Sequence, residues 1–178
     1  MYLVLPVVCF LSSDDSSAES FGKRLEEAED YAGVWQTVKD SVEFSLNERR
    51  NAIMLFLDDL PLQLGAYHPI GTNNIVLNRT LIEIVEDSVK SKPAVNALIY
   101  NLLLHEYLHA LGDLSEHNVR LKVTEVAKKC FGERHMATVI ARKTPWIMLK
   151  DIPFESILAP KRIMEIVRDF EDAGKYIV

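Results

Sequence analysis

Residues 93–112 read PAVNALIYNLLLHEYLHALG, and this stretch decides how the rest of the chain is interpreted. It is apolar nearly all round, which is typical of a helix buried in the centre of a domain. Pro93 suits the first turn of such a helix, and Gly112 suits the left-handed residue that ends it. We therefore predict a central, buried helix from about 94 to 111.

Within this helix, His105, Glu106 and His109 form the pattern H-E-x-x-H. Residues i and i+4 lie on one helix face, so the two imidazoles can reach one ion at the roughly 2 Å that zinc requires. Glu106 flanks the same site and is placed to take a proton from a metal-bound water. Burying these polar groups among leucines is unfavourable unless a partner satisfies them, and a metal is such a partner. The alternative is an exposed polar stripe on an amphipathic helix.

A third metal ligand is expected on the segment that follows the motif, because catalytic zinc usually has three protein ligands and a water. The candidates are Glu116, His117 and Glu125 on the helix predicted for about 115–131. We favour Glu116, because it has the helical phase of Val119, whereas His117 is rotated by about 100° from that face. If the first turn does not follow this phase, His117 replaces Glu116, and Glu125 stays a third option.

The string HEYLHALG, residues 105–112, resembles the motif of the zincin metallopeptidases. The resemblance covers about 75–131 and implies bound Zn²⁺, peptide hydrolysis and an edge strand that binds substrate, here residues 74–78. The form HExxHxxG is also similar to the metzincins, but Ser115 stands where that branch has histidine or aspartate. A glutamate ligand on the next helix and the small size look more like the minimal archaeal gluzincins.

The remaining sequence alternates amphipathic segments with short apolar runs, which indicates an α+β fold. We expect a zincin-like arrangement in which a small mixed sheet packs its edge strand on the buried active-site helix, with further helices around it. One metallopeptidase domain would span 1–178, with a C-terminal extension at about 132–178. Helices are expected at 17–32, 34–49, 79–90, 134–142 and 160–173, and strands at 52–57 and 74–78.

Composition favours an ordinary globular protein, and the resemblance to the zincins implies a peptide or protein substrate. The 178 residues include 48% hydrophobic and 26% charged residues and have a net charge of −6. No basic patch of the kind that binds nucleic acid is present in the sequence, so we expect no nucleic-acid partner. The oligomeric state has no sequence signal.

The cysteines and the first residues bear on the cellular compartment. Cys9 and Cys130 lie among apolar neighbours, so we interpret them as buried thiols rather than a disulfide, which fits the cytoplasm. The first eleven residues, MYLVLPVVCFL, are too short to span a bilayer and lack the basic start of a signal peptide. We expect them to form a strand or an apolar arm.

The leading hypothesis is a zinc-dependent peptidase with Glu106 as general base. The alternative is a zinc-binding zincin-fold protein that is latent or inactive and has a structural or regulatory role. In that protein, apolar residues of the C-terminal extension would cover the cleft. A third hypothesis is a metal-free helical scaffold. The covering residues would be Trp146, Ile147, Met148 and Phe154. Oxyanion stabilisation could come from Tyr67, Arg79 or Tyr107. His68 and His135 are expected to be surface or locally bonded residues.

Overall fold

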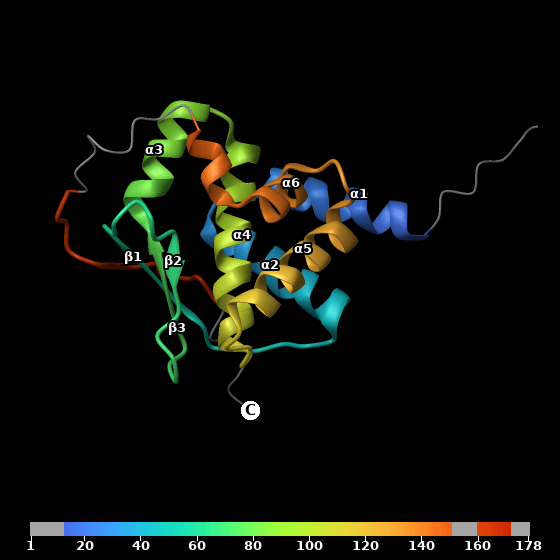
Figure 1. Cartoon of the computed structure of the whole chain (residues 1–178), viewed down its shortest axis with the longest axis horizontal. Coiled ribbons are helices and arrows are strands. Elements are labelled where there is room, and N and C mark those ends of the chain that lie inside the picture. Colours follow the sequence, from blue (N-terminus) through green and yellow to red (C-terminus); the bar gives the residue numbers. More distant parts are fainter. Residues whose placement is uncertain (1–12, 151–159, 172–178) are drawn as a thin grey trace, which may run out of the picture.

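The computed structural model describes residues 13–150 and 160–171, with side chains from residue 18 onward, and Figure 1 shows a helical part beside a small sheet. The described residues therefore form an α+β structure. Its helices and strands are α1 (Ser13–Glu26), α2 (Tyr31–Leu46), β1 (Met54–Asp58), β2 (Ala66–Tyr67), β3 (Asn74–Asn78), α3 (Arg79–Val89), α4 (Lys92–Ala110), α5 (Glu116–Phe131), α6 (Met136–Lys143), the 3₁₀ helix η1 (Pro145–Leu149) and β4 (Glu165–Ile166).

Helix α4 is the centre of the molecule, as the sequence predicted. It contacts all five of the other described α-helices and also the strands β2 and β3 of the sheet (Figure 1). Tyr100, Leu103 and Leu104 are fully buried on it. Gly112 has a φ of 109°, a value that glycine adopts without the steric penalty of a side chain, and the chain reverses there into α5.

The first two helices lie earlier in the chain than predicted. α1 ends at Glu26 and α2 begins at Tyr31, whereas the sequence suggested one helix at 17–32 and the next from 34. The cause is Asp30, whose Oδ1 accepts a hydrogen bond from the Gly33 amide at 2.8 Å and so caps α2. The predictions for α3, α5 and α6 agree with the structure to within about two residues.

The sheet has the strand order β2-β3-β1-β4. β1 and β3 run parallel, with Leu55 opposite Ile75, and β2 pairs antiparallel with β3. The expectation that 74–78 forms the edge strand is therefore wrong, because β3 is an interior strand. The segment before it, which appeared to be only turn-rich, contains β2, and β2 forms the edge beside α4.

The predicted helix at 160–173 is also wrong over its described residues, 160–171. This segment is largely extended, and its β4 pairs antiparallel with β1, with Ile166 opposite Phe56. The Val167 amide adds a hydrogen bond to the Leu55 carbonyl at 2.9 Å. The spacing of apolar residues fits a helix, but the backbone groups on the outer edge of β1 need partners, and this segment supplies them.

Two side chains near the end of this segment fasten it to α2. Phe170 stacks on Trp35 with ring centroids 5.0 Å apart. Lys39 and Glu171 form an ion pair at 2.6 Å, in which their side chains are only 5% and 6% exposed. Glu171 also accepts a hydrogen bond from the Ile53 amide at 2.6 Å. Phe170 and Glu171 thus anchor the end of the described chain in the core, whereas residues 160–166 remain exposed.

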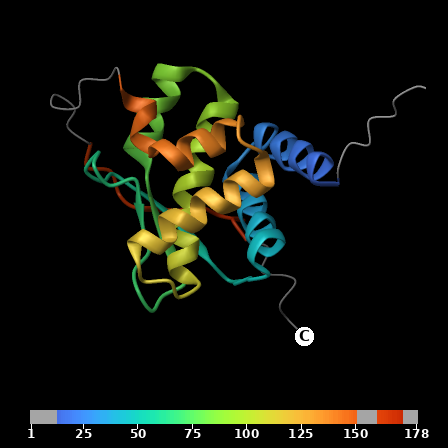
Figure 2. The same ribbon diagram turned by 45° about the vertical axis from the view of Figure 1, so that its right-hand side comes forward.

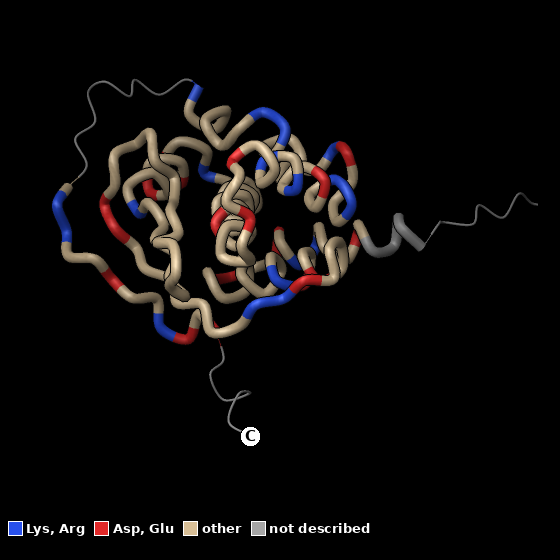
Figure 3. The backbone as a smooth tube through the Cα atoms, turned by 60° about the horizontal axis from the view of Figure 1, so that its bottom comes forward, with Lys and Arg blue, Asp and Glu red and all other residues tan. Residues whose placement is uncertain are grey.

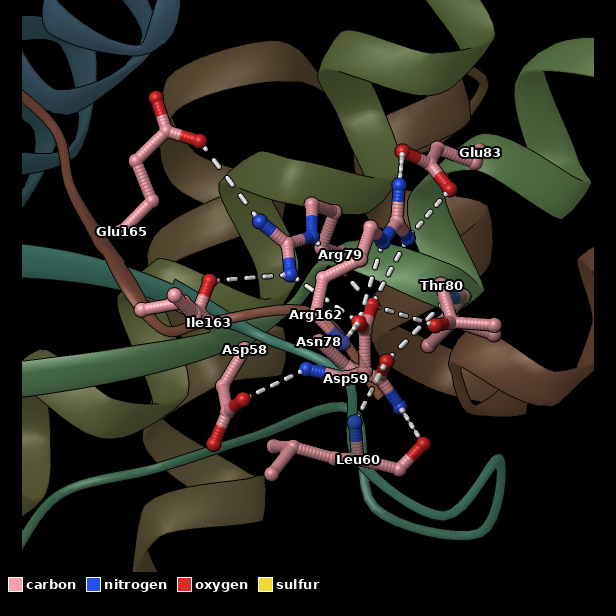
Figure 4. Close-up of polar contacts among 11 residues, drawn as sticks. Asp58, Asp59, Leu60, Asn78, Arg79, Thr80, Glu83, Arg162, Ile163 and Glu165 are labelled. Atoms are coloured by element: carbon pink, nitrogen blue, oxygen red, sulfur yellow. Dashed lines mark hydrogen bonds and ion pairs between the residues drawn. The ribbon is translucent and has the colours of Figure 1, made fainter. Parts of the chain in front are cut away.

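A buried carboxylate, Asp59, joins the end of β1 to α3 and to the C-terminal segment (Figure 4). Its side chain is 2% exposed and accepts hydrogen bonds from Arg79, Thr80 and Arg162. Arg162 also binds both oxygens of Glu83 at 2.7 Å. The hydrogen bonds from Arg162 are the largest cause that holds the pKa of Asp59 well below its usual range.

The structure bears on the expected charge distribution, on membrane spans and on the cysteines. Basic and acidic residues are interspersed along the described chain (Figure 3). Among those residues, no helix is both long and apolar enough to cross a membrane. The Cys130 thiol is buried and lies 3.2 Å from Ser45 Oγ. Cys9 and the expected strand or arm at the start of the chain lie outside the described residues.

Candidate metal centre

Helix α5 crosses the C-terminal end of α4 (Figure 2). At this crossing, side chains from the last two turns of α4 and the first turn of α5 converge: His105, His109 and Glu116. The Nε2 atoms of His105 and His109 are 3.2 Å apart. Glu116 places Oε1 at 3.1 Å from His109 Nε2 and Oε2 at 3.3 Å from His105 Nε2. The two motif histidines and the favoured third candidate are therefore brought together.

The spacing of these donor atoms fits a zinc ion. Ligand atoms about 2.1 Å from a tetrahedral zinc lie roughly 3.4 Å from one another. The two imidazole nitrogens are 3.2 Å apart, Oε1 of Glu116 is 3.1 Å from His109 and Oε2 is 3.3 Å from His105, and each of these separations is close to this value. Two imidazoles and one carboxylate are also a donor set that zinc accepts, with one position left open for water or substrate.

The backbone fixes the orientation of His109. Its Nδ1 lies 2.7 Å from the carbonyl oxygen of Asp113. A carbonyl can only accept, so Nδ1 carries the proton and the lone pair of Nε2 faces Glu116 and His105. For His105, burial is the largest cause that lowers the pKa of the imidazole, which favours the neutral form that can bind a metal.

Glu116 reaches the cluster because α5 begins with it. Ser115 caps this helix by accepting a hydrogen bond from the Asn118 amide at 3.3 Å. The expectation that Glu116 belongs to the buried stripe of α5 is wrong, because its side chain is 66% exposed. Of the alternatives, His117 lines the neighbouring cavity but is not part of the cluster, and Glu125 lies two turns farther along the helix and is exposed.

Glu106 lies beside the cluster in a largely apolar environment. It is 8% exposed, and burial raises the pKa of its carboxyl to about 7. The negative charge of Glu116 adds to this rise, whereas a backbone hydrogen bond from His68 lowers the pKa; both effects are smaller than that of burial. A carboxylate with a pKa near neutral can both accept and return a proton at physiological pH.

A cavity of about 480 Å³ adjoins the cluster. Both Glu106 and Glu116 line it. The edge strand β2 contributes Ala66, Gly65 precedes it in the lining, and η1 contributes Trp146. Trp146, Ile147 and Met148 were expected to cover a cleft; Trp146 does line the cavity, whereas Ile147 and Met148 pack partly buried against the core. Phe154 lies outside the described residues.

Two of the candidates for oxyanion stabilisation have structural partners. The Tyr107 hydroxyl is hydrogen-bonded to the Arg50 backbone, donating to its carbonyl at 3.0 Å and accepting from its amide at 2.6 Å. Arg79 binds Asp59. Tyr67 lies on β2, and the structure shows no oxyanion role for it. The remaining histidines are locally bonded, with His68 Nδ1 at 2.8 Å from the Asn74 carbonyl and His135 stacked on Phe131.

Sequence reasoning missed two contributors to the site. The Asp113 carbonyl orients His109, and Arg120 lines the cavity one turn after Glu116. The i, i+4 spacing of Glu116 and Arg120 was the signal available for the second. For the first, no sequence signal exists, because any residue has a carbonyl.

Comparisons of the chain with protein-family models, with curated proteins and with solved structures gave no match.

Proposed function

We propose that the protein is a zinc-dependent peptidase with a zincin-like fold. His105, His109 and Glu116 would hold the ion, and Glu106 would be the general base. The observation that carries this proposal is a pair of imidazole nitrogens 3.2 Å apart, each with an oxygen of the Glu116 carboxylate at 3.1 or 3.3 Å, beside the buried carboxylate of Glu106. Glu106 is 8% exposed, and a buried carboxylate is unfavourable unless a partner satisfies it.

The residues support hydrolysis of an amide bond. When bound, zinc would polarise the scissile carbonyl and lower the pKa of a water toward neutrality. Glu106 accepts the proton of the attacking water and passes it to the leaving nitrogen as the C–N bond breaks. The raised pKa of Glu106, about 7, suits both transfers.

The cavity supports a peptide or protein as the substrate. Among the described residues, β2 is the last strand of the sheet, so its outer edge can pair with an extended chain. Gly65 and Ala66 at this edge line the same cavity as Glu106. A peptide lying along β2 would therefore pass beside the metal centre.

The main experiment compares the wild type with Glu106→Gln. The variant should keep its zinc, measured by mass spectrometry of protein purified without chelator, because Glu106 is not in the donor cluster. Hydrolysis of a mixture of quenched fluorescent peptides should fall by about 100-fold or more, which is the usual size of a general-base effect. Glu125→Gln is the control and should behave like the wild type. Full activity in Glu106→Gln would refute the assignment.

A latent zinc protein is the alternative, and one observation favours it. Trp146 lines the cavity beside the metal centre, where it can limit access. Truncation at Gly132 would not test latency cleanly, because it removes α6 and its buried Ala137 and Ile140. Trp146→Ala is the better test. Activity that appears only in this variant favours latency, and equal activity in both proteins excludes a blocking role for Trp146.

A further inference from the structure

Helix α5 presents one polar stripe to the cavity. Glu116, Arg120 and Thr124 follow each other at intervals of four residues, and all three line the cavity. Four residues of α-helix rise by about 6 Å, so Arg120 begins roughly one turn along the cleft from the proposed metal ligand. This is close to the length of two residues of an extended peptide.

Arg120 is a cation whose guanidinium meets no carboxylate within the described residues. The other arginine of the cavity, Arg142, forms an ion pair with Glu133 at 2.9 Å. The hydroxyl of Thr124 donates hydrogen bonds to the backbone carbonyls of Arg120 and Ala141, and not to the guanidinium group of Arg120. Arg120 is near enough to the centre for its charge to act on His105.

Arg120 is exposed, and among the described residues the cavity that it lines has only two acidic side chains, both of which belong to the proposed site. Leu102, Leu121 and Trp146 supply apolar surface to the cavity. The acidic residues that line it are Glu106 and Glu116, and both have roles in the proposed chemistry. In a chain with a net charge of −6, an unpaired arginine at this place points to an anionic group on the ligand.

We propose that Arg120 binds a carboxylate of the substrate, so that the cleft prefers peptides with an acidic group within about two residues of the hydrolysed bond. The planar guanidinium can hold a carboxylate with two parallel hydrogen bonds. The carboxylate belongs either to an acidic side chain or to the C-terminus of the peptide. This inference rests on the proposed peptidase function, because the metal centre sets the register of the substrate.

The test is a binding experiment on the zinc-loaded full chain. Three peptides of otherwise identical sequence carry a hydroxamate, which binds zinc and fixes the register. One has glutamine and an amidated C-terminus, one has glutamate and an amidated C-terminus, and one has glutamine and a free C-terminal carboxylate. Calorimetry should show that one of the two carboxylate peptides binds at least about fivefold more tightly than the neutral peptide, as expected for a charge-assisted pair.

Variants then assign the preference to Arg120. Arg120→Gln should remove the preference and leave the affinity for the neutral peptide within about twofold, and Arg120→Lys should restore part of it. Arg134→Gln is the matched control, because Arg134 is exposed and does not line the cavity. Zinc-dependent binding of all three peptides with equal affinity would overturn the role of Arg120 and leave the peptidase proposal standing. Failure of every peptide to bind in a zinc-dependent manner would overturn both.

Discussion

Removal of the Glu116 carboxylate directly tests the proposal that this residue is the third metal ligand. In the absence of metal, Glu116→Ala should change stability by less than about 1 kcal/mol, because an exposed ion pair and an acid in a first helical turn each contribute little. The side chain is 66% exposed, and its ion pairs within the described residues are with His105 and His109. The metal-free variant is therefore a valid reference for zinc binding.

Zinc should raise the thermal stability of the wild type more than that of Glu116→Ala. At a free zinc concentration 100 times Kd, binding stabilises the wild type by about 2.7 kcal/mol, which raises Tm by roughly 5–11 °C in a chain of this size. Loss of one of three ligands should weaken binding by about 100-fold or more, since loss of an outer-shell partner alone weakens it by about 10–100-fold. At the same zinc concentration the variant then gains only about 0.4 kcal/mol, so its Tm rises by roughly 1–2 °C.

The assay is thermal unfolding with and without zinc, supported by titration against a chromophoric chelator. His117→Ala and Glu125→Ala are the matched controls, because both side chains are exposed on the same helix and lie outside the donor cluster. Both should keep the full zinc-induced rise in Tm. A full rise in Glu116→Ala together with a lost rise in His117→Ala would show that His117, not Glu116, completes the site.

Two predictions concern stability. The folded-state pKa of Asp59 lies below its unfolded value of 3.8, so the stabilisation that this carboxylate provides is complete above that pH and is lost as the pH falls below it. Asp59→Asn should lower the free energy of unfolding by roughly 1–3 kcal/mol at pH 7. The variant should also lose less stability on acidification than the wild type, as measured by urea unfolding from pH 7 to pH 2.5. An identical acid dependence in both proteins would contradict this role. Lys39→Met should destabilise by about 3–5 kcal/mol, because it leaves the Glu171 carboxylate buried without its cation, and adding Glu171→Gln should recover part of that loss in chemical denaturation. A double variant less stable than Lys39→Met alone would count against the argument.

Several features of the site could be predicted because they depend on local periodicity. The apolar run of α4 indicated a buried helix, and the four-residue spacing placed His105 and His109 on one face. Gly112 marked the reversal that brings α5 back to this face. Helical phase also selected Glu116, although the residue turned out to be exposed and reaches the cluster from the start of the helix.

Other features arise only from contacts between distant segments. The spacing of apolar residues at 160–171 fits a helix, yet the open edge of β1 draws the segment into an extended form whose Ile166 remains exposed. Lys39 would be assigned to the surface from its type, but Glu171 satisfies its charge inside the protein from 132 positions away. Nor could the sequence show that two-residue β2, rather than β3, forms the edge beside α4.

The sequence by itself thus determined the class of the fold, the central helix and the residues proposed to bind the metal, because a helix repeats its geometry every few residues. Only the tertiary structure decided the strand order, the path of the C-terminal segment and the placing of Arg120 in the cavity. Those outcomes depend on which distant backbone and charged groups satisfy each other once water is excluded, and neither hydropathy nor spacing along the chain encodes that choice.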